Sequence, residues 1–371
     1  MTGEKNLRIL FLIDSLSGGG KERRLIQLIK GLNDLGFNDL HLISLSDIND
    51  YLIINSYNVK RQVIKRKIKR DPEMFLRLYR SIKRVNPDIV HSWSIMTSFY
   101  VSIICKILRI PHVAGFVADS NPIKKFSFYH IAVLFPYRFA NAIIGNSNAG
   151  LIAYGVPKRK RRVVYNGFEM KRLQVSQNIS ELRKNLNIHT PFVVAMAARF
   201  EKMKDFQTFF DAAKRLIATR KDITFLAIGK GELYHEFENK IEESNRDYLR
   251  IIGFQNDIDS IIKMTDMGVL CTNPHFHAEG ISNSLLEFMA FGKPVIATKG
   301  GGVNELITDS INGFIIDPES PIELASKIEM ILDNPILKST IGENARVTIE
   351  TKFSSSKMTD AYLKLYKHYA S

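Results

Sequence analysis

The sequence predicts an α/β protein made of two doubly wound parallel sheets in tandem. Short runs rich in β-branched residues alternate with amphipathic, helix-like segments along the chain, which is typical of parallel βαβ construction. This cycle pauses in the polar stretch 168–190 and then restarts. The length of 371 residues, 45% of them hydrophobic, is enough for two cores of ordinary size. We therefore expect one unit over 1–172, a second over 173–353, and an appended segment over 354–371.

The first unit contains strand and helix candidates in alternation. Its strand candidates are short apolar runs bounded by polar or turn-forming residues, and they span 7–13, 40–45, 89–91, 112–116 and 142–146. Its helix candidates carry apolar residues at helical spacing, and they span 21–35, 73–85 and 101–108.

The second unit repeats the same alternation. Its strand candidates span 192–197, 224–228, 250–252, 267–270, 294–297 and 313–315, each separated from the next by a helical pattern such as 206–219. Beyond the last strand candidate, Met358, Tyr362, Leu365 and Tyr366 recur at helical spacing, so we expect a final amphipathic helix.

Composition excludes several classes of protein. Cys105 and Cys271, the two cysteines, lie in apolar surroundings, so we expect buried reduced thiols and neither a disulfide framework nor a cysteine-rich zinc site. Charged residues interrupt the longest apolar stretches, 94–118 and 126–145, so a membrane-spanning helix is not expected. Residues 1–8 lead directly into the first strand candidate without a secretory pattern, which favours a cytoplasmic globular protein.

The charge is distributed unevenly between the two halves. Residues 1–172 hold 29 Lys and Arg against 12 Asp and Glu, a net charge of +17, whereas 173–371 hold 23 against 26, a net charge of −3. A basic half attracts a polyanion, either nucleic acid or the anionic surface of a membrane. A solvated basic surface without a partner stays open as the alternative.

A glycine-rich loop follows the first strand candidate. Gly18, Gly19 and Gly20 lie between Asp14 and a helix candidate that starts near Lys21. Residues without a Cβ let backbone amides approach an anion, and a helix N-terminus adds partial positive charge. The spacing fits neither the dinucleotide fingerprint nor a P-loop, so a phosphate site and a tight strand-to-helix turn both stay open.

The most informative segment of the second unit is a pair of carboxylates eight residues apart. Glu279 and Glu287 flank Ser282 and Asn283, two residue types that favour helix N-caps. If a helix begins there, the amides of Asn283 and Ser284 point at the ligand in front of it. Glu279 then stands in the preceding loop and Glu287 about one turn inside. Such an arrangement can hold a sugar, a ribose diol and a phosphate; an ordinary surface loop is the alternative.

Two cations, Arg199 and Lys204, follow the strand candidate 192–197. Loops at the carboxyl ends of parallel strands are where ligands bind in such sheets. Both cations could neutralise a diphosphate, whose departure from a sugar develops negative charge. Either one, taken singly, also fits a solvated surface cation.

The motif Glu279-x7-Glu287, continued by the segment 288–298, resembles the signature of retaining glycosyltransferases of family 4, which have the GT-B fold. The resemblance covers essentially the whole chain. Its further motifs are Gly18-Gly19-Gly20, Asp88-Ile89-Val90-His91, Asn146-Ser147, Tyr165-Asn166-Gly167, Arg199 with Lys204, Gly253-Phe254, Gly300-Gly301 and Asn312-Gly313-Phe314, in the expected order. The resemblance implies two Rossmann-like domains that face an interdomain cleft, with the final helix packed back on the first domain.

The resemblance also implies roles for individual residues. Arg199 and Lys204 would bind the donor diphosphate and stabilise it as the leaving group. Glu279 would contact hydroxyls of the transferred sugar, and Glu287 the ribose hydroxyls. Further donor contacts in the same segment would be Gly280, Ser282, Asn283 and Ser284, and the backbone amides of Asn283 and Ser284 would bind the phosphates. Gly253 and Phe254 would contact the nucleobase. Gly19 and Gly20 would close over the sugar-phosphate.

The implied reaction moves a hexose or N-acetylhexosamine from a nucleotide sugar, most commonly linked to UDP, with retention of anomeric configuration and without a metal or other cofactor. The implied acceptor is a lipid-linked or polysaccharide glycan of the cell surface. The basic first unit is then expected to face the anionic inner surface of the membrane, as a peripheral cytoplasmic protein. We expect Phe126, Phe128, Tyr129 and Phe135 at that surface; the alternative places them in the core of a helix packed on the sheet.

Two departures from the family pattern affect the site. Residues 281–282 are Ile-Ser where many members carry Phe-Gly, and 117–119 are Val-Ala-Asp where many carry a histidine near the reacting carbon. Asp119 and His91 are the candidates to replace that histidine on the acceptor side. His91 also fits a packing residue at a strand end.

No metal site is expected. His275 and His277 lie two residues apart without a third ligand, so we interpret them as loop histidines. Asp257 and Asp259 have the spacing of the metal-diphosphate motif of the other glycosyltransferase fold. They open a helix-like run, however, where capping and the helix dipole explain both acids.

Two other functions stay open. A nucleotide-sugar epimerase of the same fold would need no acceptor, but it fits the Glu279-x7-Glu287 motif poorly. A nucleic-acid-binding protein would use the basic half, but no RNA-binding, zinc-finger or helix-turn-helix motif accompanies the positive runs. A specific nucleic-acid partner is therefore not expected.

Overall fold

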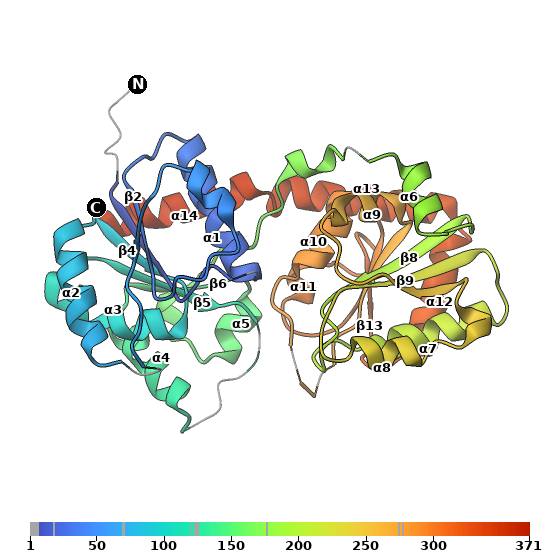
Figure 1. The fold of residues 1–371 in the computed structure, drawn as a ribbon, viewed down its shortest axis with the longest axis horizontal. Helices are drawn as coiled ribbons and strands as arrows, with labels where there is room; N and C mark the ends of the chain where they lie inside the picture. Colours follow the sequence, from blue (N-terminus) through green and yellow to red (C-terminus); the bar gives the residue numbers. More distant parts are fainter. Residues whose placement is uncertain are drawn as a thin grey trace. The chain divides into compact units, whose positions relative to one another are not determined.

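The computed structural model describes residues 7–17, 19–68, 71–119, 121, 126–175, 177–273, 275–276 and 278–371. Gly18 and His277, which the sequence singles out, lie outside these residues. The chain forms two compact units, Met1–Gly167 with Ser355–Ser371, and Phe168–Ser354 (Figure 1). Residues 168–172 thus belong to the second unit, whereas the sequence predicts a boundary after residue 172.

The first unit is built on a seven-stranded parallel sheet of order β3-β2-β1-β4-β5-β6-β7. Ile9 of an inner strand, the third in this order, pairs with Leu40 on one side and Ile89 on the other. The strands are β1 (Ile9–Ile13), β2 (Leu40–Ser44), β3 (Lys60–Val63), β4 (Ile89–Ser92), β5 (His112–Val117), β6 (Ala142–Gly145) and β7 (Arg161–Val163). The edge strands β3 and β7 do not match any strand predicted from the sequence. Most of their residues are basic, and all are exposed or only half-buried, so they lack the apolar run that marks a buried strand.

Helices cover both faces of this sheet, because successive side chains of a strand point to opposite faces. Ile9, Phe11 and Ile13 share one core with α1 (Gly20–Asp34). Leu10 and Leu12 share another with α2 (Glu73–Val85) and α3 (Ile95–Leu108). The remaining helices of this unit before its last segment are α4 (Phe128–Phe139) and α5 (Asn148–Ala153), with short 3-10 turns at Leu52–Ser56 and Lys158–Lys160.

The last helix, α14 (Ser355–Ala370), returns to the first unit and packs on α1. Its buried residues Met358, Tyr362 and Tyr366 join the core that contains Phe11. A Cβ at Gly31 of α1 would lie 2.2 Å from Thr359 Oγ1. The two helices therefore approach too closely there for a larger side chain.

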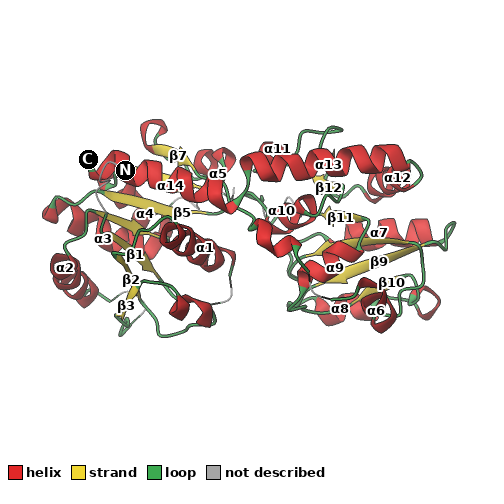
Figure 2. Ribbon diagram, turned by 90° about the horizontal axis from the view of Figure 1, so that it is seen from above, coloured by secondary structure: helices red, strands yellow, loops and turns green. Residues whose placement is uncertain are grey.

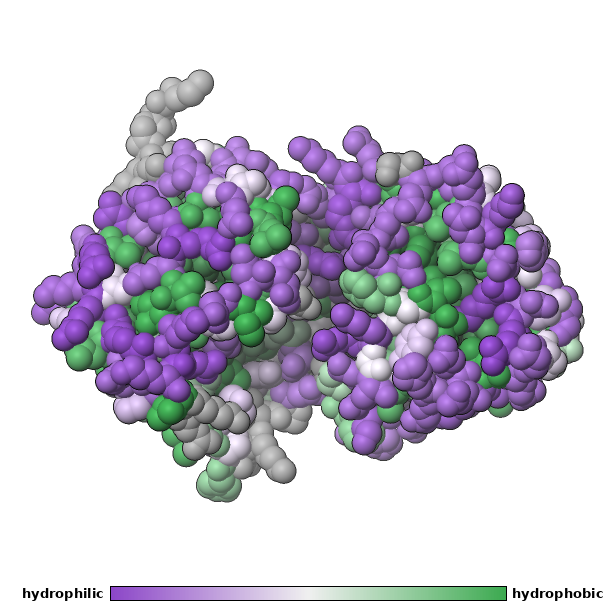
Figure 3. Space-filling view, viewed as in Figure 1, coloured by the Kyte–Doolittle hydropathy of each residue, from purple (hydrophilic) through white to green (hydrophobic). Residues whose placement is uncertain are grey.

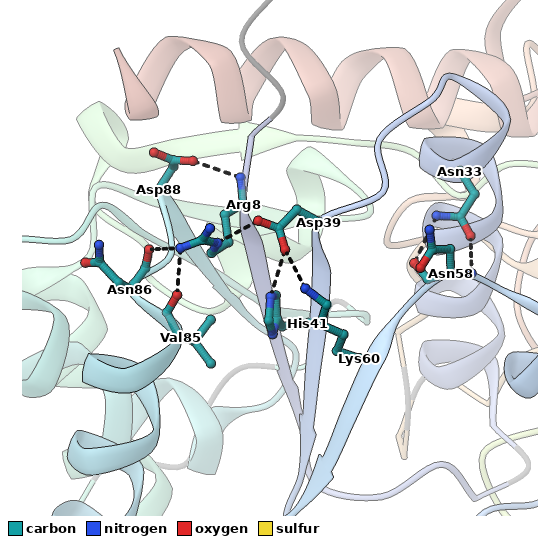
Figure 4. A network of polar contacts seen from close by, with 9 residues as sticks. All are labelled: Arg8, Asn33, Asp39, His41, Asn58, Lys60, Val85, Asn86 and Asp88. Carbon is teal, nitrogen blue, oxygen red and sulfur yellow. Dashed lines mark hydrogen bonds and ion pairs between the residues drawn. The ribbon is translucent and has the colours of Figure 1, made fainter.

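Polar contacts join four strands of the first sheet at their amino ends (Figure 4). Arg8 donates from its side chain to Asp39 Oδ2 at 2.6 Å and from its backbone to Asp88 Oδ2 at 2.8 Å. His41 and Lys60 contact Asp39 Oδ1 at 3.0 and 3.2 Å. Burial raises the pKa of Asp39, but the hydrogen bonds of its three partners outweigh burial and lower this pKa to about 2. The network thus stabilises the amino ends of these strands, whereas ligands bind at the carboxyl ends in such folds.

The second unit contains a six-stranded parallel sheet of order β10-β9-β8-β11-β12-β13 (Figure 2). Its strands are β8 (Phe192–Ala197), β9 (Ile223–Ile228), β10 (Leu249–Ile251), β11 (Met267–Leu270), β12 (Val295–Thr298) and β13 (Phe314–Ile316). Its helices are α6 (Ile179–Asn185), α7 (Phe206–Ile217), α8 (Tyr234–Asn239), α9 (Ile258–Met264), α10 (Asn283–Ala290), α11 (Val303–Leu306), α12 (Pro321–Leu332) and α13 (Pro335–Lys352), with 3-10 turns at Met170–Leu173 and Glu243–Asn245. The α/β prediction of two Rossmann-like units is confirmed.

Strand order reverses once in each sheet, beside β1 in the first and beside β8 in the second. In doubly wound sheets the crevice at this point, outside the carboxyl ends of the strands, is the usual ligand site. In the second unit it lies between the loop after β8 and the loop after β11. These two loops carry Lys204 and Glu279.

Candidate active site

The loops after β8 and β11 are joined by backbone hydrogen bonds. Asp205 N donates to Cys271 O at 3.1 Å, and Asn273 N donates to Met203 O at 3.1 Å. Asp205 also caps α7, because its Oδ1 accepts from Thr208 N at 3.0 Å. The cap and the bridges fix the backbone on either side of Lys204.

Lys204 and Glu279 form an ion pair at the carboxyl edge of the second sheet. Their side chains are 16% and 11% exposed, so water screens the pair only weakly. Burial lowers the pKa of Lys204 to about 8, and the charge of Glu201 opposes this shift. The structure thus brings together two of the predicted residues, a cation and a carboxylate.

The glycines after β12 hold the backbone of Glu279. Gly302 N donates to Glu279 O at 2.7 Å. Gly301 has φ +55°, and a Cβ there would lie 1.9 Å from Glu279 O, so only glycine fits. Glu279 also lines a small cavity of about 90 Å³, together with Thr272, Ala278, Thr298, Lys299, Gly300 and Val303. Thr272 contributes a buried hydroxyl without a hydrogen-bond partner among the described residues.

Helix α10 begins where the carboxylate motif predicts. Asn283 is its first residue, and the preceding Ser282 makes no side-chain capping hydrogen bond. The hydroxyl of Ser284 is buried without a hydrogen-bond partner in the part of the chain that the structure describes. Gly280 and Ser282 are buried in the turn that joins Glu279 to this helix. A helix N-terminus whose N-cap side chain makes no capping hydrogen bond is suited to an anion.

Glu287 is 7% exposed and lies within a charged network that the sequence analysis missed. Its Oε1 accepts from Arg172 Nη2 at 3.0 Å, and Arg172 also contacts both carboxylate oxygens of Asp259. Asp257 caps α9 through Ser260 N at 3.1 Å, as the capping interpretation predicts. No motif in the sequence marks Arg172, because its partners lie 87 and 115 positions away along the chain.

The other predicted donor residues of the second unit lie in loops at the same end of its strands. Arg199 is 70% exposed and its Nη1 lies 3.0 Å from Glu201 Oε1. Gly253 has φ +64°, and its carbonyl accepts from Gly229 N at 2.9 Å. Phe254 is 61% exposed, and Lys230 Nζ lies 4.9 Å from its ring centroid. An exposed aromatic ring beside a cation suits a planar base.

Gly19 and Gly20 begin α1 in the first unit. Gly19 is the N-cap, and a Cβ there would lie 2.3 Å from Glu22 Oε2. Its carbonyl accepts from Tyr51 Oη at 3.0 Å. Asp119 is half-buried in the loop after β5, and its Oδ1 accepts from Asn121 N at 3.0 Å.

His91 does not fit the acceptor-side role expected for it. Its side chain is fully buried, and its Nδ1 lies 2.6 Å from Tyr366 Oη. Its ring centroid is 4.6 Å from that of Trp93. Burial, with the charges of Arg24 and His112, holds its pKa well below the usual range. The structure supports the alternative, a neutral packing residue at a strand end.

Helix α4 presents apolar side chains to solvent. Phe126, just before the helix, is 93% exposed, and the exposed apolar residues on the helix are Tyr129, Ile131, Leu134 and Phe139. Figure 3 shows hydrophobic atoms at the lower edge of the first unit, where Figure 1 places α4. Phe128 and Phe135 are half-buried, because they pack against Phe99 with ring centroids 6.3 and 4.7 Å away.

The described residues contain neither a metal-ligand cluster nor a helix that could span a membrane. Within them, no three His, Cys, Asp or Glu side chains gather as a metal site requires. His275 is 70% exposed, with its Nε2 3.6 Å from Glu319 Oε1. Across the same residues, no helix is both long and apolar enough to cross a bilayer. Cys105 and Cys271 are free and buried, as predicted.

Two family models match the chain in succession. The model for glycosyltransferase family 4 matches residues 18–172, and the model for glycosyl transferases group 1 matches residues 178–348. The two matches meet close to the boundary between the compact units.

Curated relatives are similar over different shares of the chain. The UDP-Gal:alpha-D-GlcNAc-diphosphoundecaprenol alpha-1,3-galactosyltransferase of Escherichia coli is 26% identical over 312 residues, 80% of this chain and 79% of that protein. The lipopolysaccharide core biosynthesis glycosyltransferase LpsD of Rhizobium meliloti is 23% identical over 94% of this chain and 95% of its own. The match to the uncharacterized glycosyltransferase MJ1178 of Methanocaldococcus jannaschii, 30% identical, spans 45% of this chain and 46% of that protein.

Solved structures show the same fold. Anabaena Alr3699/HepE in complex with UDP superposes with a TM-score of 0.85 at 23% identity, covering 98% of this chain and all of that one. Its complex with UDP-glucose gives a TM-score of 0.82 at 24% identity over the same shares. The family models, the relatives and the geometry of both sheets agree. The chain belongs to the group 1 and family 4 glycosyltransferases, which have the GT-B fold.

Proposed function

We propose that this chain is a retaining glycosyltransferase that moves a hexose or N-acetylhexosamine from a UDP sugar to a lipid-linked or polysaccharide acceptor. The observation that carries the proposal is the buried Lys204–Glu279 pair beside the N-terminus of α10. A cation, a carboxylate and a helix N-terminus at one loop cluster match two parts of a nucleotide sugar. The cation and the helix N-terminus suit the two phosphates of the diphosphate, and the carboxylate suits the hydroxyl groups of the sugar.

In this proposal the second unit binds the donor. The Lys204 ammonium and the first-turn amides of α10 neutralise the diphosphate. Glu279 accepts hydrogen bonds from sugar hydroxyls, and Glu287 accepts them from the ribose. The exposed ring of Phe254 stacks on the base, while Arg199 reaches the outer phosphate from its exposed loop. Gly19 and Gly20 stay predictions from the sequence.

The proposed reaction breaks the bond between the anomeric carbon and the diphosphate. The electron pair of that bond goes to the leaving phosphate oxygen, while an acceptor oxygen attacks the anomeric carbon from the same face. The departing diphosphate takes the acceptor's proton, so the balance needs no separate base. Lys204 stabilises the charge that grows on the diphosphate, which is why we propose a reaction that proceeds without a metal.

The relatives support the choice of donor and acceptor class. The name of the Escherichia coli relative gives UDP-Gal as donor and a diphosphoundecaprenol-linked sugar as acceptor. Another relative is a capsular polysaccharide biosynthesis glycosyltransferase, CapM of Staphylococcus aureus, which is 27% identical over 54% of this chain. A lipid-linked acceptor also gives the basic first unit a role at an anionic cytoplasmic membrane surface.

The surface around α4 supports that membrane association. Exposed apolar groups at Phe126, Tyr129 and Leu134 can enter the headgroup region. The neighbouring α2, which packs on α3 as α4 does, carries Lys83 and Arg84 in its last turn. Cations next to exposed apolar side chains are the combination that anionic lipid attracts.

Nucleotide binding is the first experiment for the proposed function. A ligand that binds only the folded state raises the unfolding midpoint. We expect UDP to raise it in the presence of EDTA, with smaller shifts for GDP, ADP and NAD. A shift that needs added magnesium would refute the metal-free donor site. A sugar nucleotide that is isomerised without release of UDP would identify an epimerase instead.

Membrane association is tested by sedimentation with lipid vesicles at low salt. We expect more protein to bind vesicles that contain anionic lipid, which creates a negative surface potential, than to bind neutral vesicles. Phe126→Ser should reduce binding to the anionic vesicles. Ile336→Ser is the matched control, since Ile336 is an exposed apolar residue of the second unit. Equal binding to both vesicle types would refute the membrane role.

A further inference from the structure

Arg172 connects three elements of the second unit that are far apart in the sequence. It lies in the 3-10 turn Met170–Leu173, while Asp259 lies in α9 and Glu287 in α10. Its Nε lies 2.9 Å from Asp259 Oδ2, and its Nη2 lies 2.6 Å from Asp259 Oδ1. The same Nη2 lies 3.0 Å from Glu287 Oε1. One guanidinium therefore joins both carboxylates.

Aromatic packing fixes the guanidinium in place. The carbon at its centre lies 4.8 Å from the ring centroid of Phe168. Phe168 in turn packs edge-on against Phe291 at 6.3 Å, and its amide donates to Phe353 O at 2.7 Å. The planar fork of an arginine can stack on a ring and bind a carboxylate with two bonds at once.

Burial makes this arrangement rigid and strong. The side chains of Arg172, Asp259 and Glu287 are 22%, 19% and 9% exposed. Burial lowers the pKa of Arg172, but the hydrogen bonds and charges of Asp259 and Glu287 outweigh burial and raise it above its ordinary value. The guanidinium stays charged, and it separates two carboxylates that would otherwise repel each other.

We propose that Arg172, held by Asp259, is the positioning residue for Glu287, and that this clamp determines how strongly the donor site selects a ribonucleotide over a 2′-deoxyribonucleotide. The inference rests on the proposed function, because it takes Glu287 as the group that binds the ribose. A carboxylate fixed in advance loses less conformational entropy when a hydroxyl group binds to it. A carboxylate free to change rotamer holds the ribose hydroxyl less well.

The second unit also contains a matched control for this clamp. Arg220 contacts both oxygens of Asp222, at 3.0 and 2.8 Å, and Asp333 at 2.6 Å. It is similarly buried, with a side chain 16% exposed. Asp222 directly precedes β9, so this network lies at the amino ends of the strands, away from the candidate site. Its loss should affect stability without affecting ribose recognition.

The experiment is calorimetric titration of UDP and 2′-deoxyUDP into the full chain and four variants. A hydrogen bond to a charged group contributes about 1.5–3 kcal/mol, which corresponds to about 10–150-fold in affinity. We expect the unaltered chain to prefer UDP by a factor in this range, and Glu287→Gln to lose most of the preference. Arg172→Lys keeps the charge but not the fork, and we expect it to reduce the preference to less than about fivefold. Asp259→Asn should reduce the preference less, and Arg220→Lys should leave it unchanged.

Three results distinguish a failure of the clamp from a failure of the proposed function. If Glu287→Gln loses the preference but Arg172→Lys and Asp259→Asn keep it, the clamp is refuted and the ribose contact stands. If Glu287→Gln keeps the preference, the ribose contact is refuted and the clamp with it. If Arg220→Lys lowers the preference as much as Arg172→Lys does, the effect is one of general destabilisation and the clamp is refuted. Asp259→Asn keeps the test valid should Arg172→Lys fold poorly, because it weakens the same clamp from its other end.

Discussion

Replacing Lys204 with methionine should weaken UDP binding, whereas replacing Glu279 with glutamine should leave UDP binding intact and reduce transfer. The two side chains form one buried ion pair, but in the proposed site they contact different parts of the donor. Lys204 faces the diphosphate, so its loss removes a charge-assisted contact of about 1.5–3 kcal/mol, about 10–150-fold in affinity. Glu279 contacts the sugar, which UDP lacks. Removing its charge also releases Lys204 from competition, so UDP should bind as tightly as before or more tightly.

Calorimetry with UDP and a transfer assay with the sugar nucleotide measure the two effects separately. Lys338→Met is the matched control, because Lys338 also pairs with a carboxylate of this unit, Asp266, at 2.9 Å. Lys204→Met leaves the Glu279 carboxylate buried without its cation, so the double variant with Glu279→Gln separates lost attraction from new repulsion. Unfolding midpoints confirm that each variant is folded. Near-normal UDP affinity in folded Lys204→Met would refute the division of roles. A loss of UDP affinity in Glu279→Gln and Lys338→Met as large as the loss in Lys204→Met would also refute it.

Three further predictions concern pH and stability. Because the pKa of Lys204 is lowered to about 8, the UDP affinity measured by calorimetry should be full below pH 8 and fall as pH rises through it. A flat profile between pH 7 and 9.5 would contradict this. Gly301→Ala should destabilise the second unit by about 3 kcal/mol, since its φ is +55° and its Cβ would overlap Glu279 O; an unchanged urea midpoint would contradict the strain. The folded-state pKa of Asp39 is depressed to about 2, so its stabilisation is present above the unfolded pKa of about 4 and lost as pH falls toward 2. After a discount for solvent screening, Asp39→Asn should therefore cost about 1 kcal/mol at pH 7 and little at pH 2, measured by denaturant unfolding.

The sequence predicts the sheets because their central strands are buried on both faces. Runs such as 192–197 and 267–270 are continuous in apolar residues, and β8 and β11 coincide with them. The edge strand β3 is missed because all four of its residues are exposed. The start of α3 is also missed: it begins at Ile95, after a capping box of Ser94 and Thr97, six positions before the predicted 101.

The candidate site could be predicted where its residues are close in the sequence. Glu279 and the start of α10 belong to one continuous motif, so their spacing defines their geometry. Arg172 could not be found in this way, because its pairing with Asp259 and Glu287 depends on how three distant segments pack. The surroundings of His91 could not be predicted for the same reason, since its partner Tyr366 lies 275 positions away in the last helix.

The most direct test of the proposed function is proton NMR of the sugar released when the protein is incubated with UDP sugars and EDTA. UDP-glucose, UDP-galactose and UDP-N-acetylglucosamine are supplied in turn, with water taking the place of the acceptor. We expect at least one of them to be cleaved to UDP, with the α anomer of the free sugar forming first and the β anomer appearing later by mutarotation. Formation of the β anomer first, cleavage only with added metal, or an isomerised UDP sugar without release of UDP would contradict a metal-free retaining transferase.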